Sequence, residues 1–198
     1  MNSKGNIVWE KSLGGSEGES AFSVQQTADG GYIVTGITNS NDGDVSHNFG
    51  GTDGWVVKLN GSGKIEWQKT FGGSKREWIN NIRQTTDGGY IFTGFTESND
   101  GNLSGISGRR SNRNIWLVKL NANGEIVCQK LFGGSKADNG KAIQQTKDGG
   151  YIVAASSSSN GDVLINRGGQ DFWIIKFTCF PLYSCLMFPL SVKRSIFK

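Results

Sequence analysis

The chain has 198 residues, with 30 glycines and only 2 prolines, a composition that fits a turn-rich globular protein and excludes collagen and a proline-rich linker. Its formal net charge is +4, but Lys193, Arg194 and Lys198 lie in the final segment 178–198, which contains no acid. Without those three side chains the net charge falls to about +1 (4 minus 3), so it does not indicate a nucleic-acid-binding surface.

Residues 7–14, near the start of the chain, match a segment that returns farther along. The stretch NIVWEKSLGG is similar to KIEWQKTFGG at 64–73 and to EIVCQKLFGG at 125–134. Both later copies stand at the end of a repeat unit. We therefore predict a strand over 7–14 that corresponds to the fourth strand of such a unit.

One phrase occurs three times along the chain. It reads QQTADGGYIVTG at 25–36, RQTTDGGYIFTG at 83–94 and QQTKDGGYIVAA at 144–155. The equivalent tyrosines, Tyr32, Tyr90 and Tyr151, lie 58 and 61 residues apart (90 minus 32 and 151 minus 90), so the period is near sixty. A period of this length predicts a row of similar structural units. The units are repeat 1 at about 15–72, repeat 2 at about 73–133 and repeat 3 at about 134–177.

Each repeat begins with two predicted strands joined by a tight turn. In repeat 1 the stretch AFSVQQT precedes an Asp-Gly pair at 29–30 and YIVTGIT follows it; the same pair stands at 87–88 and 148–149. Asp-Gly favours a two-residue type I′ turn, because Gly accepts a positive φ freely and Asp tolerates it. After a variable loop, two more predicted strands surround NGSG at 60–63 and NANG at 121–124.

Four short strands per unit predict a blade of a β-propeller. Segments such as WVVKL (55–59) are apolar on both sides, as expected for a sheet with a neighbouring sheet on each face. We therefore expect an all-β protein of four-stranded antiparallel blades, an incomplete or open propeller of about three repeats within residues 1–177. Repeat 3 stops after DFWIIKF at 171–177, and the strand at 7–14 could supply its missing fourth strand.

Closed propellers have about four to eight blades, so three repeats leave the closure of the ring open. Three interpretations follow: the chain is a fragment of a longer array, two copies self-associate into a six-bladed ring, or the units form an open arc. An open arc would expose apolar faces. We therefore rank the fragment first and the dimer second.

The last segment, 178–198, breaks the repeat pattern and contains both prolines and two of the three cysteines. We interpret it as an aberrant apolar and basic tail outside the repeat, produced by a shifted reading frame or an altered gene end. The alternative is a membrane segment, but 177–192 is short and is interrupted by Pro181 and Pro189. No membrane span is therefore predicted.

The cysteines, Cys128, Cys179 and Cys185, are odd in number and irregular in spacing, which predicts neither a disulfide framework nor a metal site. Cys128 stands at the repeat position of Trp9 and Trp67, so we expect a packed thiol. The N-terminus has no apolar signal segment, and export is not predicted from this sequence.

The segments LGGSEGESAFSVQQTADGGYIVTGIT (13–38) and DGWVVKLNGSGKIEW (53–67) resemble the SBBP type of bacterial β-propeller repeat. The resemblance extends over 7–177. It implies a propeller, commonly within secreted or cell-surface bacterial proteins, without a shared catalytic site. The segment LNGSGKIEW (59–67) is more weakly similar to the docking motif of quinone-dependent dehydrogenase propellers, in which the tryptophan locks blades together.

Acidic or amide side chains recur at two positions of the repeat, three residues after the Ser of GGS and two residues before the Trp of the third strand. They are Glu19, Glu77 and Asp138 at the first position, and Asp53, Asn114 and Asp171 at the second. We expect them to accept hydrogen bonds from backbone amides at the strand starts; a ring of acids around a central channel is the alternative. The only histidine, His47, lies in one variable loop, so no nucleophile–base arrangement is indicated.

The variable loops TNSNDGDVS, TESNDGNLS and SSSNGDV place oxygen-bearing side chains at related positions. These candidate Ca²⁺ ligands are Asp42, Asp44, Asp100, Asn102 and Asp162. Alternating oxygen ligands around a Gly are similar to a calcium loop. The match is incomplete, because Thr or Ser stands where the first Asp belongs and no Glu closes the site. No catalytic residue and no other cofactor site is predicted.

The predicted function is that of a non-enzymatic propeller module, part of a larger secreted or cell-surface protein. Sequence differences between repeats collect in the loops 45–52, 103–113 and 163–170. Loops on a rigid scaffold are common binding sites, so we expect them to bind a protein or a glycan. The alternative is part of a propeller enzyme with a metal or quinone cofactor at the central channel.

Overall fold

The computed structural model describes residues 5–108, 113–158, 160–162 and 166–177. They form eleven β-strands and one short 3-10 helix, η1 (Gly101–Leu103), so the expected all-β class is confirmed. The strands are β1 (Glu19–Gln26), β2 (Tyr32–Thr38), β3 (Asp53–Leu59), β4 (Ile65–Phe71), β5 (Glu77–Gln84), β6 (Tyr90–Thr96), β7 (Asn114–Leu120), β8 (Ile126–Phe132), β9 (Asp138–Gln145), β10 (Tyr151–Ser157) and β11 (Asp171–Phe177).

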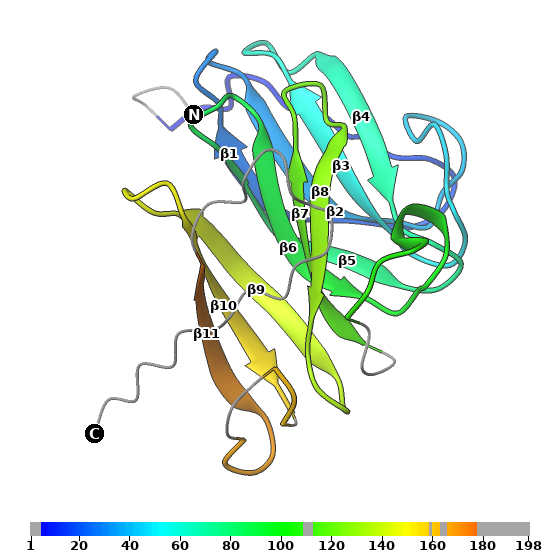
Figure 1. Ribbon diagram of the computed structural model, residues 1–198. Helices are drawn as coiled ribbons and strands as arrows, with labels where there is room; N and C mark the ends of the chain where they lie inside the picture. Colours follow the sequence, from blue (N-terminus) through cyan, green and yellow to red (C-terminus); the bar gives the residue numbers. More distant parts are fainter. Residues whose placement is uncertain (1–4, 109–112, 159, 163–165, 178–198) are drawn as a thin grey trace.

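Three antiparallel sheets contain these strands, each in chain order (Figure 1). The first sheet is β1-β2-β3-β4, the second is β5-β6-β7-β8 and the third is β9-β10-β11. Equivalent residues pair in the same register, as Tyr32 with Leu59 in the first sheet and Tyr90 with Leu120 in the second. Within the described residues the sheets form no closed ring, and β11 pairs with β10 alone.

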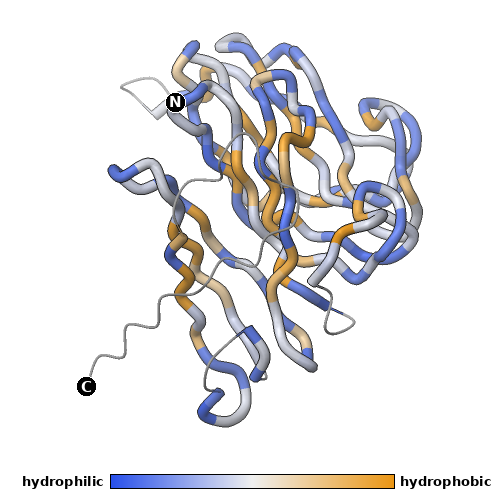
Figure 2. Tube along the Cα trace, in the orientation of Figure 1, coloured by the Kyte–Doolittle hydropathy of each residue, from blue (hydrophilic) through white to orange (hydrophobic). Residues whose placement is uncertain are grey.

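The second sheet lies between the other two (Figure 1). Val56 and Val57 are adjacent in β3 and point to opposite faces, yet both are buried. Val56 shares an apolar cluster with Ile79 of the second sheet, and Leu117 of the second sheet shares one with Ile143 of the third. Every residue of β6 and β7 is buried, so the expected cover on both faces is confirmed there. Figure 2 shows apolar stretches along the strands and mostly hydrophilic turns and loops.

The hairpin turns are longer than the two residues that we predicted. Gly30 N donates to Thr27 O, and Thr27 N donates to Gly31 O, so the connection between β1 and β2 spans residues 27–31. Asp29 closes this turn, because its Oδ1 atom accepts hydrogen bonds from Gly31 N and from the Thr27 hydroxyl. Gly30 has φ +80°, a conformation in which a residue without Cβ is favoured. The same backbone pattern closes the turns before β6 and β10.

Residues 7–14 do not form the predicted strand. A strand needs a hydrogen-bonded neighbour, and no described strand pairs with this segment. The Trp9 ring instead packs edge-on against Tyr32, with the ring centroids 5.6 Å apart. Leu13 packs against the cluster that contains Val57 and Leu59. The segment thus remains on the first sheet and does not complete the third sheet of its own chain.

The predicted tail, 178–198, lies outside the described residues, as do Cys179 and Cys185. Cys128 is a buried thiol, as expected from its position in the repeat. Among the residues that the structure describes, no helix has the length and apolar character needed to cross a membrane.

Candidate functional site

The two ends of the sheets differ in the segments that they carry. Neighbouring strands are antiparallel, so the ends of β2 and β4 lie beside the starts of β1 and β3. This end, the loop end, carries the variable loops and the links between sheets, such as 39–52 and 72–76. The opposite end, the turn end, carries the tight turns, such as 27–31 and 60–64. Every predicted acid at a strand start therefore lies at the loop end.

The acids of the first set accept backbone hydrogen bonds, as we expected. Glu77 Oε2 accepts from Gly73 N at 2.8 Å, while Oε1 accepts from Thr96 Oγ1 at 2.7 Å and from Ser98 N at 3.1 Å. The equivalent contacts in the other repeats join Glu19 to Gly15 N and Asp138 to Gly134 N. Each of these side chains therefore holds in place the segment that leads into its sheet.

The acids of the second set also accept backbone amides, Asp53 from Phe49 N and Asp171 from Arg167 N. Asp53 Oδ1 has no hydrogen-bond partner among the described residues. Burial raises the pKa of Asp53 to about 7, against the lowering effect of the Phe49 hydrogen bond, and repulsion from Glu77 adds to the rise. Asp53 and Glu77 are both fully buried. No substrate reaches them, so this carboxyl pair is structural.

The five candidate Ca²⁺ ligands bind backbone amides at the loop end. Asp42 Oδ1 accepts from Ser16 N at 2.7 Å, and this hydrogen bond lowers the pKa of Asp42. The contacts of the other four join Asp44 to Gly14 N, Asp100 to Ser74 N, Asn102 to Gly72 N and Asp162 to Gly133 N. They fasten each variable loop to the GGS segment. In the described part of the chain, no three His, Cys, Asp or Glu side chains form a group that could hold a metal ion.

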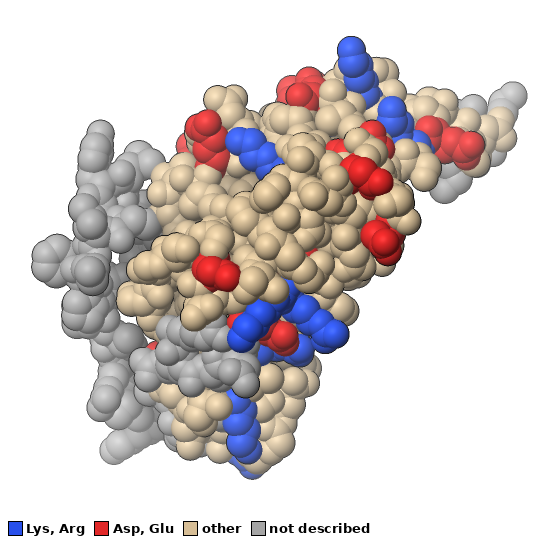
Figure 3. All heavy atoms as spheres, turned by 90° about the vertical axis from the view of Figure 1, so that its right-hand side faces the viewer, with Lys and Arg blue, Asp and Glu red and all other residues tan. Residues whose placement is uncertain are grey.

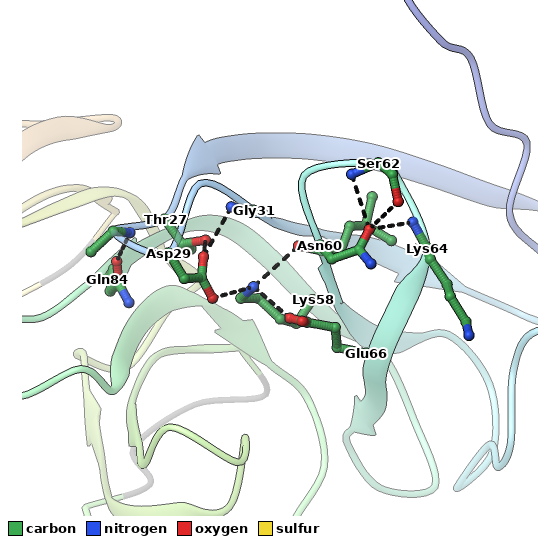
Figure 4. A network of polar contacts seen from close by, with 11 residues as sticks. Thr27, Asp29, Gly31, Lys58, Asn60, Ser62, Lys64, Glu66 and Gln84 are labelled. Carbon is green, nitrogen blue, oxygen red and sulfur yellow. Dashed lines mark hydrogen bonds and ion pairs between the residues drawn. The ribbon is translucent and has the colours of Figure 1, made fainter.

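A polar network occupies the turn end of the first sheet (Figure 4). The buried Lys58 places its Nζ atom 2.8 Å from Asp29 Oδ2 and 2.7 Å from Glu66 Oε2, and it donates to Leu59 O. Burial lowers the pKa of Lys58, but the contacts with Asp29 and Glu66 outweigh it and the net pKa is raised. The other sheets repeat the ion pair as Lys119 with Asp87 and Lys176 with Asp148. Because this Lys–Asp ion pair occurs in every repeat, we assign it a structural role in holding the turn. It does not mark a ligand-binding site.

One cluster at the loop end is not repeated, and we call Phe22, Trp78, Phe95 and Arg113 the aromatic patch. The Trp78 ring lies 5.4 Å from that of Phe22 and 5.6 Å from that of Phe95, between centroids. Arg113 Cζ stands 4.3 Å above the Phe95 ring. Two hydrogen bonds to Glu97 Oε1, at 2.9 and 2.7 Å, fix the guanidinium. Phe22 and Trp78 are 40% and 37% exposed, so a ligand can contact both rings.

Local strand geometry positions the two exposed rings. The register of β1 against β2 shifts between Ala21 and Ser23, which leaves Phe22 unpaired in a bulge; bulges redirect side chains in this way. Trp78 stands directly opposite Phe95 in the pairing of β5 with β6, and aromatic cross-strand pairs of this kind are stabilising.

The aromatic patch was not predicted from the sequence. The other repeats have polar residues at the position of Phe22, namely Asn80 and Lys141, and at the position of Trp78, namely Ser20 and Asn139. An aromatic residue in one copy where the others are polar was therefore the available signal. The carboxylates, in contrast, recur in every repeat, and such recurrence indicates a structural role.

Basic and acidic side chains are interspersed on the face that Figure 3 shows. His47 is exposed and packs edge-on against Phe49, with the centroids 4.5 Å apart. Comparison with protein-family models and with curated protein sequences gave no match to this chain. The aromatic patch is thus the candidate site on the grounds of geometry.

Proposed function

We propose that this chain is a non-enzymatic β-propeller repeat module that binds a protein or a glycan at its loop end. The observation that carries the proposal is the aromatic patch. Aromatic and Arg side chains contribute most of the energy at binding hot spots. Phe22 and Trp78 are held by contacts with their neighbours, so binding costs little side-chain entropy.

The identification of each sheet as a propeller blade rests on the strand order and on the way the sheets stack. Each sheet runs in chain order, and the second packs against both neighbours, which suits blades of this architecture. The resemblance of 7–177 to the SBBP repeat supports the same interpretation. It also supports a place within a larger secreted or cell-surface protein.

The variable loops lie at the same end of the sheets as the aromatic patch and would add specificity. Arg113 is the last residue of the loop 103–113, and Phe49 of the loop 45–52 lies near Gly101 of the next repeat. Residues 109–112 of one predicted binding loop and 163–165 of another lie outside the described residues. The side chains that support the proposal all belong to the described part of the chain.

The test exchanges each exposed ring for the residue that another repeat carries at the same position. Phe22→Asn copies Asn80, and Trp78→Asn copies Asn139, so both changes suit the local backbone. The matched control is Val127→Glu, an exposed apolar residue on β8 whose equivalent is Glu66.

The wild-type chain is screened against a glycan array and a displayed peptide library, and the ligand retained is titrated against all variants. We expect both Asn variants to weaken its binding by roughly 10- to 100-fold and the control to match the wild type. Unchanged affinity in both Asn variants would show that the patch is not the site. A wild-type chain that retains neither class of ligand would contradict the proposed function itself.

A further inference from the structure

Each sheet has two apolar faces, and the contacts between sheets distinguish them. We call the face that a sheet turns toward the preceding sheet its leading face, and the opposite face its trailing face. Ile82, on the leading face of the second sheet, shares a cluster with Ile33 and Val56 on the trailing face of the first. Ile143, on the leading face of the third sheet, shares one with Leu117 on the trailing face of the second. One type of contact therefore occurs twice.

Among the residues that the structure describes, no sheet packs against the leading face of the first sheet. Val24 occupies the position of Ile82 and Ile143, yet it is 61% exposed, whereas they are 0% and 2% exposed. A hollow of about 560 Å³ lies over this face and is lined by Val24, Tyr32 and Val34. At the equivalent place on the second sheet, the trailing face of the first sheet fills the space. The hollow is thus lined by apolar side chains of the kind that form the contacts between sheets.

The trailing face of the third sheet is likewise covered by no described sheet. Ile174 is 60% exposed, whereas Val56 and Leu117 at its position are 0% and 1% exposed. Ile152 is 38% exposed, whereas Ile33 at its position is fully buried. A contiguous apolar face of this kind marks a contact site in a folded protein.

Residues 7–14 show what belongs against the first sheet. The rings of Trp9 and Tyr32 lie 5.6 Å apart at an interplanar angle of 68°, and those of Trp67 and Tyr90 lie 5.7 Å apart at 67°. Trp67 belongs to β4, the fourth strand of the first sheet, whereas Tyr90 belongs to β6 of the second sheet. Trp9 therefore occupies the place of the fourth strand of a sheet that would precede the first.

We propose that two copies of this chain associate head to tail. The trailing face of the third sheet in one copy covers the leading face of the first sheet in the other, and residues 7–14 of the second copy pair with β11 as its fourth strand. The two faces lie on opposite sides of the second sheet and cannot meet within one chain. Made twice, the contact closes a ring with twice the three sheets of one chain, within the range of closed propellers.

The repeat also predicts the register of the new strand pair. Val56 pairs with Lys69 in the first sheet, and Leu117 pairs with Lys130 in the second. Ile174 is the equivalent of Val56 and Leu117, and Lys11 is the equivalent of the two lysines. Ile174 of one copy should therefore stand opposite Lys11 of the other.

The first test measures the mass of the full chain by sedimentation equilibrium over a range of micromolar concentrations. We expect twice the chain mass of 21.4 kDa. A charge on either face, in Val24→Asp or Ile174→Asp, should raise the dissociation constant at least about 100-fold. Val127→Glu is the control and should leave it unchanged; circular dichroism checks that each variant is folded.

The second test does not depend on tolerance of a buried charge. The double variant Lys11→Cys/Ile174→Cys should form a covalent dimer under mild oxidation, because directly opposed strand residues are close enough for a disulfide. Each single-cysteine variant controls for the native thiols and should stay uncrosslinked. A wild-type chain of single mass overturns the proposal and leaves both faces to another partner. A larger open assembly, or a dimer that survives Ile174→Asp and fails to crosslink, overturns it equally.

Discussion

Asp53 and Glu77 begin strands of two different sheets, yet their carboxylates meet beside the same glycine. Asp53 Oδ1 and Glu77 Oε2 both lie within 3 Å of the point that a Cβ on Gly72 would occupy. The two side chains are fully buried, so neither can turn out to solvent to make room. Gly72 is therefore required at the link between the first and second sheets.

Gly72→Ala should destabilise the protein by roughly 2–4 kcal/mol, because the new methyl group must displace two buried carboxylates that hold backbone amides. The free energy of unfolding in urea measures the loss. The control is Gly18→Ala, whose Cβ would meet only Asn39 Nδ2, at 3.6 Å. The control should change stability by less than about 0.5 kcal/mol. Equal losses in both variants would contradict the close approach at Gly72.

Asp53→Asn should remove a dependence of stability on pH. The folded pKa of Asp53 is about 7, above its usual value of 3.8, so the folded state holds a proton that the unfolded chain has released. The stabilisation of the folded state by this bound proton is therefore present at low pH and is lost as the pH rises from about 4 to about 7. The variant should be more stable than the wild type by roughly 1–3 kcal/mol at pH 8.

The shape of the variant side chain suits the site, since Asn114 stands at the equivalent position of the next repeat. The measurement is urea unfolding of both proteins at several values between pH 5 and pH 8. Parallel stability curves for wild type and variant over this range would show that Asp53 does not hold the proton.

The paired strands of this fold were predictable from the sequence, because each carries its own pattern. The apolar runs at Tyr32, Tyr90 and Tyr151 lie in β2, β6 and β10, and the strands expected after the variable loops are β3, β7 and β11. The repeat added the expectation that the sheets cover one another, since adjacent residues such as Val56 and Val57 are both apolar. Local pattern and packing agree there, so the prediction succeeded.

Features that depend on a partner in space were not predictable in this way. Residues 7–14 have the composition of a strand, but strand formation needs a neighbour, and the described part of their own chain does not provide one. The turn at 27–31 is longer than expected because the Asp29 carboxylate and the Thr27 hydroxyl extend its hydrogen bonding. The exposure of Phe22 follows from a bulge in β1, for which AFSVQQT contains no local signal.

Removing the partners of Lys58 should cost more than removing Lys58 itself. In Asp29→Asn/Glu66→Gln, the buried ammonium loses both charged partners and keeps only neutral acceptors, Leu59 O among them, and we expect a loss of about 2–3 kcal/mol. In Lys58→Met, the two carboxylates are half-exposed and regain water, so the loss should be about 1 kcal/mol or less. Urea unfolding of the three proteins compares the losses, and the reverse order would contradict this account.

Asn81 connects all three sheets through one side chain, and its removal should weaken both junctions. Its Nδ2 atom donates to Ser23 Oγ in β1 at 3.1 Å, and its Oδ1 atom accepts from Ile143 N in β9 at 3.1 Å. Asn81→Ala removes both hydrogen bonds and should cost about 1–2 kcal/mol, whereas Ser23→Ala removes one and should cost about half as much. The double variant should be no less stable than Asn81→Ala, because the Ser23 hydrogen bond is already absent. Strict additivity of the two losses in urea unfolding would mean that Asn81 and Ser23 act independently, and the hydrogen bond between them would then contribute nothing to the connection between the first two sheets.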